Sequence, residues 1–490
     1  MQIHKHLSLF FGLVFSLIIT SCSQENSRTP DKSSNQIIKF QWSPTATAQA
    51  TIRVINENNL PVADASILIG QAIDNPFSGN LVKTNKDGLA LAPTAWTNPT
   101  SVTIDATKYV RQTLLDLPPG DLIIKMYTSL DASVTTLQGN ITGLPVVDGD
   151  KQIDYALVMP AFSRLDMLNF SLDLAISPIN ETISVANRSV EVPINLSLPT
   201  QVERYLLFNV TLSKPTYHLN VPFKGKKTFY AASGRFPFKP VVDGLNNNKS
   251  FYDLINEFSI TGGTLREVNL NSNVVNLDIP AAELQFTGKT NIKAPSFKND
   301  EAVIMVATSD AAQSLIPTDI KRVTSGQSIE LNSLSNKPTY IVSALKRQSE
   351  MNSDTVGANR LSASFLTTKN YSSTLLPLVE NPSVRQNSGY EVTLPNPPTL
   401  PSQLNALATT VVISDIVQVD AKTKNYVPRW EIVGLNWQKK VQLPNWPMSN
   451  PNNKKRFEIN YIASNLKSSV RIDDDIIKST THITHASTEY

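Results

Sequence analysis

The chain has 490 residues, a formal net charge of +3 at pH 7 and a single cysteine. This length corresponds to about three domains. The balanced charge argues against a nucleic-acid-binding protein, which carries a basic stripe, and one cysteine excludes a disulfide scaffold or a multi-thiolate metal site. Apolar residues make up 41% of the chain, which is too many for a disordered protein.

The N-terminus has the pattern of a secretion signal. A polar start that carries Lys5 precedes the apolar run 7–20. As a helix this run would be about 21 Å long, shorter than the ~30 Å hydrocarbon core of a bilayer. Residues 1–21 are therefore interpreted as a signal peptide rather than as a membrane-spanning helix.

The residues at the end of this run carry a more specific pattern, which consists of Ile19, Thr20, Ser21 and Cys22. This pattern resembles the lipobox of bacterial lipoproteins. The resemblance implies cleavage before Cys22, a diacylglycerol thioether on its sulfur and an added acyl chain such as palmitate. Because Ser23 follows, rather than the Asp associated with inner-membrane retention, we expect a lipoprotein of the outer membrane.

Residues 22–47 are predicted to be the lipidated cysteine and a flexible tether, since 23–36 contains no aliphatic or aromatic residue. Short alternating apolar runs then predict strands separated by polar turns. The predicted strands are 50–55, 65–69, 89–91, 102–106 and 122–126.

Three stretches of the segment 48–127 resemble the carboxypeptidase-regulatory-like, transthyretin-like β-sandwiches of secreted bacterial proteins. They are 58–65 (NNLPVADA), 84–89 (TNKDGL) and 102–109 (VTIDATKY), and Asp87-Gly88 in the second predicts a hairpin turn. Asn59 and Lys108 stand where that family usually has Gly; Asn tolerates a left-handed conformation, and Lys108 predicts a less tight turn. The resemblance implies an accessory module without catalytic residues.

The remainder is β-rich and resembles no known family. Short runs of Val, Ile, Thr and Tyr predict sheets, 250–258 predicts a short helix, and 310–315 predicts a helical turn. The proline-rich segment 394–401 predicts a linker. We therefore expect an all-β, multidomain protein, in which an Ig/transthyretin-like β-sandwich at 48–127 precedes β-rich domains at 130–390, with a split near 298, and at 402–490.

Two groups of residues have the composition of a metal site. Asp148, Asp150 and Asp154 have the spacing of a short calcium-binding loop, although an acidic β-turn is the preferred interpretation. His482 and His485 supply imidazole groups, but residues three apart face opposite sides of a strand, so a plain final strand is predicted.

Three of the five tryptophans lie close together in the sequence: Trp430, Trp437 and Trp446. Clustered aromatic rings next to polar groups bind sugar rings or a partner protein. The alternative, which we prefer, is that the indoles fill the core of a small sheet.

No nucleophile-elbow, phosphate-loop or zinc-protease motif occurs in the chain. We therefore predict a non-catalytic, lipid-anchored accessory protein of the cell envelope, which binds a protein or glycan partner, no nucleic acid and no cofactor. Two alternatives stay open. One is an envelope glycan hydrolase with an accessory β-module, and the other is a calcium-dependent adhesin.

Overall fold

The computed structural model describes a chain that is almost entirely β, which confirms the predicted all-β, multidomain class. The described residues are 40–45, 49–56, 59–71, 81–127, 135–143, 153–160, 176–185, 188–199, 205–211, 216–221, 225–237, 240, 243–244, 247, 251–280, 283–311, 314–350, 360–386, 390–418, 424–443, 446, 454–465 and 479–490.

The chain divides into two compact units. Unit 1 includes Ser133–Val356 and Ser362–Leu375, and unit 2 consists of Gln36–Ala132, Gly357–Leu361 and Leu376–Tyr490. Unit 1 therefore lies in the sequence between the two main parts of unit 2. The predicted domains 48–127 and 402–490 both contribute to unit 2, and their individual boundaries stay a prediction.

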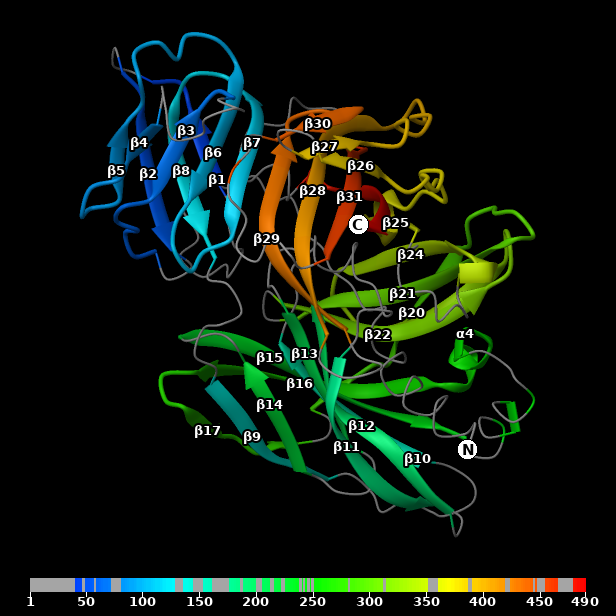
Figure 1. The fold of residues 1–490 in the computed structure, drawn as a ribbon. Coiled ribbons are helices and arrows are strands. Elements are labelled where there is room, and N and C mark those ends of the chain that lie inside the picture. Colours follow the sequence, from blue (N-terminus) through cyan, green and yellow to red (C-terminus); the bar gives the residue numbers. More distant parts are fainter. Residues whose placement is uncertain are drawn as a thin grey trace. The chain divides into compact units, whose positions relative to one another are not determined.

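The N-terminal part of unit 2, called the module below, contains eight strands in two sheets (Figure 1). One sheet has the order β1-β8-β2-β5, and β7, β6, β3 and β4 are consecutive neighbours in another. The strands are β1 (Phe40–Ser43), β2 (Thr51–Asn56), β3 (Ser66–Ile69), β4 (Leu81–Lys83), β5 (Leu89–Leu91), β6 (Thr100–Asp105), β7 (Arg111–Leu117) and β8 (Asp121–Met126).

The period-two pattern of the sequence decides which face of these strands is buried. In β2, Ile52 and Val54 are fully buried whereas Arg53 between them is exposed. In β8 the same alternation buries Leu122 and Ile124. Successive side chains of a strand point to opposite faces, so these residues supply the apolar layer of the module.

The turn at Asp87-Gly88 differs from a simple hairpin. Gly88 has a φ of +70° as expected, and the Asn85 side chain accepts hydrogen bonds from the backbone N–H groups of Asp87 and Leu89. However, β4 pairs with β3 while β5 pairs with β2. The turn therefore connects two different sheets instead of two paired strands.

The expectation of a less tight turn at Lys108 is wrong. Lys108 adopts a φ of +74°, and Asn59 adopts a φ of +60°. Both positions at which glycine was expected thus have the left-handed backbone that glycine favours. The substitution to lysine leaves the turn conformation in place and adds strain instead of loosening the turn.

The C-terminal part of unit 2 contributes β26 (Ser383–Gln386), β27 (Tyr390–Thr393), β28 (Asn405–Gln418), β29 (Lys424–Gly434), β30 (Lys440–Gln442), β31 (Lys455–Ser464) and β32 (His482–Glu489). The sheet order β32-β31-β28-β29-β7 joins these strands to the module, because β29 pairs in parallel with β7. A small sheet, β26-β27-β30, is separate. The buried cluster of unit 2 draws on both sheets, with Ile413, Phe457 and Ile459 from the large one and Val392 and Val441 from the small one.

Unit 1 contains several sheets, of which the largest has the order β11-β12-β13-β10-β15-β16-β19. A second has the order β14-β9-β17 with β18 beside β9, a third is β20-β23, and β22, β21, β24 and β25 are consecutive neighbours. The strands are β9 (Thr135–Thr142), β10 (Ile153–Pro160), β11 (Ile176–Val185), β12 (Arg188–Pro199), β13 (Tyr205–Thr211), β14 (Thr216–Val221), β15 (Lys226–Phe236), β16 (Ser259–Asn269), β17 (Val274–Asn276), β18 (Ile279–Pro280), β19 (Leu284–Gln285), β20 (Gly288–Lys293), β21 (Glu301–Ala311), β22 (Ser314–Val323), β23 (Ser328–Ser333), β24 (Thr339–Arg347) and β25 (Leu361–Thr367).

Helical segments are short. The predicted helix at 250–258 is present as α4 (Phe251–Leu254) followed by η2 (Ile255–Glu257), and η3 (Gln348–Glu350) and η4 (Thr368–Asn370) are single turns. The helical turn predicted at 310–315 is wrong. Those residues belong to the hairpin of β21 and β22, in which Asp310 pairs with Leu315 and Ala311 with Ser314, because strand pairing satisfies backbone groups that an isolated turn leaves open.

Candidate functional site

Several of the predicted site residues lie outside the described residues, namely Ile19, Thr20, Ser21, Cys22, Asp148 and Asp150. Asp154 lies in β10, where its backbone pairs with that of Arg235. Within the described ranges, no group of three or more His, Cys, Asp or Glu side chains is arranged to hold a metal ion. The lipid-attachment and calcium hypotheses therefore stay predictions.

The two C-terminal histidines lie in β32 and are both buried. The His485 Nδ1 atom is 2.9 Å from the Asn460 amide oxygen, and the Asn460 Nδ2 group donates to the Thr410 hydroxyl at 2.9 Å. In the strand pairing, Asn460 of β31 lies opposite Thr410 of β28 and opposite His485 of β32. These polar groups form a hydrogen-bonded row across three strands, which satisfies the buried imidazole.

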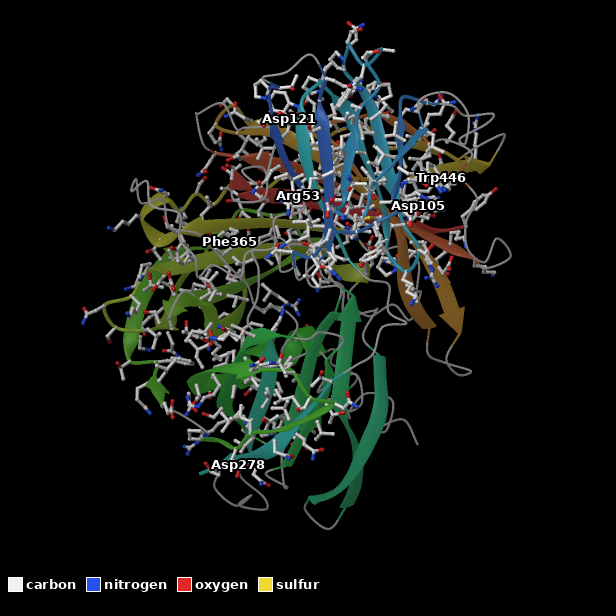
Figure 2. All side chains as sticks on the ribbon, turned by 90° about the vertical axis from the view of Figure 1, so that its left-hand side faces the viewer. Arg53, Asp105, Asp121, Asp278, Phe365 and Trp446 are labelled. Carbon is white, nitrogen blue, oxygen red and sulfur yellow. The ribbon has the colours of Figure 1, made fainter. Side chains whose placement is uncertain are left out.

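Trp430 and Trp446 lie in the core of unit 2, where they are 0% and 5% exposed. Between them stands Arg111 of β7, whose guanidinium carbon is 4.6 Å from the Trp430 ring centre and 4.8 Å from that of Trp446. Asp105 of β6 pairs with the same guanidinium at 3.2 Å, and Figure 2 labels Asp105 and Trp446 in this part of unit 2. Burial lowers the pKa of Arg111, and the charge of Asp105 opposes that shift.

A hydrogen bond fixes the orientation of the Trp430 indole. Its Nε1–H group donates to the Thr113 hydroxyl at 2.8 Å, which lies 2.9 Å from the Thr103 hydroxyl. This arrangement links β29 to β7 and β6 through side chains as well as through the backbone. The two indoles and Arg111 therefore hold the module to the C-terminal strands of unit 2.

Trp437 is half-buried. Its ring packs against Tyr461 with centres 5.5 Å apart, and its Nε1–H group donates to the carbonyl of Ile462 at 2.8 Å. The Tyr461 hydroxyl lies within hydrogen-bonding distance of the carbonyls of Pro395 and Gln438. All three tryptophans thus contribute to packing within unit 2, and the indole N–H groups of Trp430 and Trp437 donate to partners inside it.

A buried cluster of charges, which the sequence analysis missed, lies on β28, β29 and β31. Asp415 is completely buried and contacts the Lys455 ammonium group and the Arg429 Nε, the latter at 2.8 Å. Lys455 is itself 2% exposed. The signal was available in the run 409–417, where a single acidic residue interrupts β-branched residues, since an acidic side chain at such a position requires a buried partner.

Unit 1 contains an open hollow of about 390 Å³ between the start of β21 and the end of β22. It is lined by Phe297, Lys298, Asn299, Glu301, Arg322 and Ser325, among others. Arg322 also pairs with Asp253 of α4, and the Ser325 hydroxyl accepts a hydrogen bond from the backbone N–H of Phe297 at 2.9 Å. The hollow therefore combines an aromatic ring with charged and amide groups on internally braced loops.

In the part of the chain that the structure describes, no helix is long and apolar enough to cross a bilayer.

Comparisons with known proteins place this chain in no family. No protein-family profile matches it, and no curated protein does so. Among solved structures, the TIE protein of Bacillus anthracis is 10% identical with a TM-score of 0.14, over 61% of this chain and 45% of that one. The chain thus spans less than half the length of that protein.

Two further solved structures have similar scores. The major pilin subunit BcpA of Bacillus cereus, in a variant form, is 10% identical over 60% of this chain and 87% of its own, with a TM-score of 0.14. The fimbrial protein FimP of Actinomyces oris is 11% identical over 82% and 98%, also with a TM-score of 0.14. Scores this low carry no argument about function.

Proposed function

We propose that this protein is a lipid-anchored, non-catalytic accessory protein of the bacterial cell envelope, which binds a protein or glycan partner. Support for the anchor comes from the sequence, because the only cysteine stands at the lipobox position, Cys22. Two or three acyl chains hold a protein stably on a membrane, since each buried methylene contributes about 0.8 kcal/mol.

One observation supports the non-catalytic role: the buried charged and aromatic groups of unit 2 described above are paired or stacked with one another. Asp415 is paired with Lys455 and Arg429, and Arg111 is stacked between two indoles. A catalytic acid or base needs access to a substrate atom within hydrogen-bonding distance. These groups instead face partners within the sheets, which is the arrangement of structural ion pairs.

The hollow of unit 1 supports the proposed binding role. Phe297 offers an apolar ring surface, while Lys298 and Asn299 are exposed beside it. An aromatic face with neighbouring amide and charged groups is suited to a sugar ring or to an extended peptide. The partner is therefore proposed to be a glycan or a protein segment, bound at a shallow surface.

Metabolic labelling with palmitate tests the anchor. The full chain is expected to incorporate the label and to fractionate with outer membranes, whereas Cys22→Ala is expected to lose both properties. Ser23→Ala is the matched control and should label normally. Labelling that persists in Cys22→Ala contradicts the anchor.

Incubation with isolated peptidoglycan and envelope polysaccharides tests the non-catalytic role. The full chain is expected to co-sediment with its partner material without releasing soluble sugars. Release of new reducing ends would instead establish a glycan hydrolase.

A further inference from the structure

One edge of the module exposes apolar side chains to an unusual degree. The described residues include five large hydrophobic side chains that are exposed, and three of them, Leu60, Leu89 and Leu91, belong to this edge. Leu60 and Leu91 are each 57% exposed and Leu89 is 37% exposed. Scattered apolar residues on a surface need no explanation, whereas a group on one edge marks a contact site.

The register shows how these residues come together. Leu91 and Leu89 of β5 lie opposite Thr51 and Arg53 of β2. Beyond the start of β5, the same edge continues with Pro61, which bridges to Ile55. Leu91, Leu89 and Pro61 therefore lie in one row on the outer face of the sheet, because alternate positions along paired strands share a face.

Leu60 lies at the end of this row. Its carbonyl accepts a hydrogen bond from the backbone N–H of Asn56 at 2.8 Å, and its own N–H donates to the Asn56 side chain at 3.0 Å. The turn that carries Leu60 is thus held by its own hydrogen bonds. The structure fixes an exposed leucine there in a defined backbone conformation, and we call Leu60, Pro61, Leu89 and Leu91 the leucine edge.

The charges around the leucine edge are balanced. The exposed charged residues are two cations, Arg53 and Lys86, and two anions, Asp64 and Asp87. Figure 2 shows Arg53 on the module, near the start of the neighbouring strand β8, where Asp121 is labelled. A partner held mainly by electrostatic attraction needs charges of one sign. The leucine edge instead suits an apolar partner that is insensitive to salt.

The chain between Cys22 and the module has the length that a membrane partner requires. The module begins with Phe40 in β1, so seventeen residues, 23–39, lie between it and the cysteine. A flexible segment of that length has a root-mean-square span of roughly 23 Å. From β1 to β5 the sheet is only about 14 Å wide, at ~4.8 Å per strand step.

We infer that the leucine edge rests on the surface of the lipid bilayer that holds the anchor, and inserts Leu89, Leu91 and Leu60 among the headgroups. The inference rests on the proposed lipid anchor, which brings the module within reach of the membrane. Insertion of leucine side chains into the interfacial region removes their apolar surface from water, which lowers the free energy. The module would then keep one orientation relative to the membrane.

Depth-dependent fluorescence quenching tests this inference. Because Cys22 is the only cysteine and its sulfur is proposed to carry lipid, Leu91→Cys introduces a single free thiol for an environment-sensitive fluorophore. Ser43→Cys, exposed on the opposite edge strand β1, is the matched control. Both full-length variants are purified from membranes and reconstituted into phosphatidylethanolamine–phosphatidylglycerol vesicles that contain nitroxide-labelled lipid.

The expected result is quenching at position 91 that is at least about twofold stronger than at position 43, and unchanged in high salt. Equal quenching at the two positions, or none at position 91, overturns the inference. Palmitate labelling of the same preparations reports separately on the anchor. A labelled protein without quenching at position 91 refutes the leucine edge alone, whereas an unlabelled protein refutes the proposed anchor.

A second pair of variants measures the same contact from another position. In the lipid-anchored Leu60→Cys protein that carries the fluorophore, Leu89→Ser with Leu91→Ser is expected to weaken the quenching at position 60 about twofold or more. Arg53→Ser with Lys86→Ser, the control on the same sheet and turn, is expected to change this quenching less. Quenching that the leucine substitutions leave unchanged, or that only the charge variant loses, overturns the inference.

Discussion

Arg111 and Trp430 are register partners in the parallel pair β7–β29, and the Arg111 guanidinium also stacks on the Trp430 ring at 4.6 Å. The same two residues are thus joined through the backbone ladder and through their side chains. Because one belongs to the module and the other to the C-terminal part of unit 2, this pair is one of the contacts that couple the two parts.

Arg111→Met is expected to lower the free energy of unfolding of unit 2 by about 2 kcal/mol. Methionine fills most of the space but removes the cation–π contacts with both indoles and leaves Asp105 without its ion pair. All five tryptophans belong to unit 2, so urea unfolding followed by tryptophan fluorescence reports on this unit alone.

Arg53→Met is the control for that measurement. Arg53 lies exposed in β2 of the same module, and exposed substitutions usually change stability by less than about 0.5 kcal/mol. If Arg111→Met and Arg53→Met lower the free energy of unfolding equally, the position of Arg111 between the indoles adds nothing to stability.

Asp415→Asn is expected to cost about 3–5 kcal/mol in unit 2, because it removes the carboxylate that the buried ammonium group of Lys455 contacts. Glu391→Gln breaks an ion pair with Lys440 that is partly exposed, at 2.7 Å, and should cost less than about 1 kcal/mol. The same urea experiment compares the two.

The double variant Asp415→Leu with Lys455→Met provides the converse test. Replacing a buried ion pair by apolar side chains is often neutral, so this protein should be more stable than Asp415→Asn. If it is instead less stable, Arg429 rather than Lys455 is the partner that requires the carboxylate.

Lys108→Gly is expected to raise the stability of unit 2 by about 1 kcal/mol, since glycine adopts the observed φ of +74° without the cost that a side chain carries. Asn59→Gly should give a smaller gain, because asparagine tolerates this region. Thermal unfolding followed by tryptophan fluorescence measures both. An unchanged or lower midpoint for Lys108→Gly would show that the lysine side chain stabilises the turn.

Gly88→Ala is expected to be strongly destabilising. A Cβ atom there would lie 2.4 Å from the Val54 carbonyl oxygen, in addition to requiring a φ of +70°. Gly70→Ala has the same sign of φ but ordinary contact at 3.8 Å, so it isolates the backbone cost of about 1 kcal/mol. The difference between the thermal-unfolding midpoints of Gly88→Ala and Gly70→Ala measures the contribution of close packing between the turn and β2.

Alkaline pH should weaken unit 2 partly through Tyr461. Burial holds the pKa of the Tyr461 phenol above its usual value. The phenol is protonated in both states below about pH 9, so its contribution is then complete. Above about pH 10 the unfolded state ionises first and the free energy of unfolding falls. The stability difference between the wild-type chain and Tyr461→Phe should therefore shrink from neutral to alkaline pH in urea titrations, and a difference that stays constant would contradict the effect of burial.

Local patterns were sufficient to predict much of the fold. The alternation in β2 and β8 predicted both strands, and the structure shows that the apolar positions of each lie on its buried face. The error at 310–315 arose because the sequence there resembles a short helical turn, while the pairing of β21 with β22 determines its conformation. Pairing partners outside the local window decide such segments.

The arrangement around Arg111 could not be predicted in this way. Thr113 and Trp430 are 317 positions apart, and nothing near Arg111 in the sequence indicates a parallel partner. The tryptophan cluster itself was visible in the sequence. Its burial follows because each indole has a large apolar area and only one N–H group that needs a partner. The polar partners that satisfy these groups, Thr113 for Trp430 and the Ile462 carbonyl for Trp437, required the structure.

The parallel pair of β7 and β29 also has a consequence for the order of folding. Thr113 and its partner Trp430 are 317 positions apart, with all of β9–β25 between them in the chain. Contacts that close such a long loop form late in folding, because the entropy of loop closure must be offset first. Until they form, β7 has an unpaired edge and Arg111 lacks its two indoles. Such an edge pairs readily with other chains, so the partly folded module is exposed to aggregation until β29 joins it.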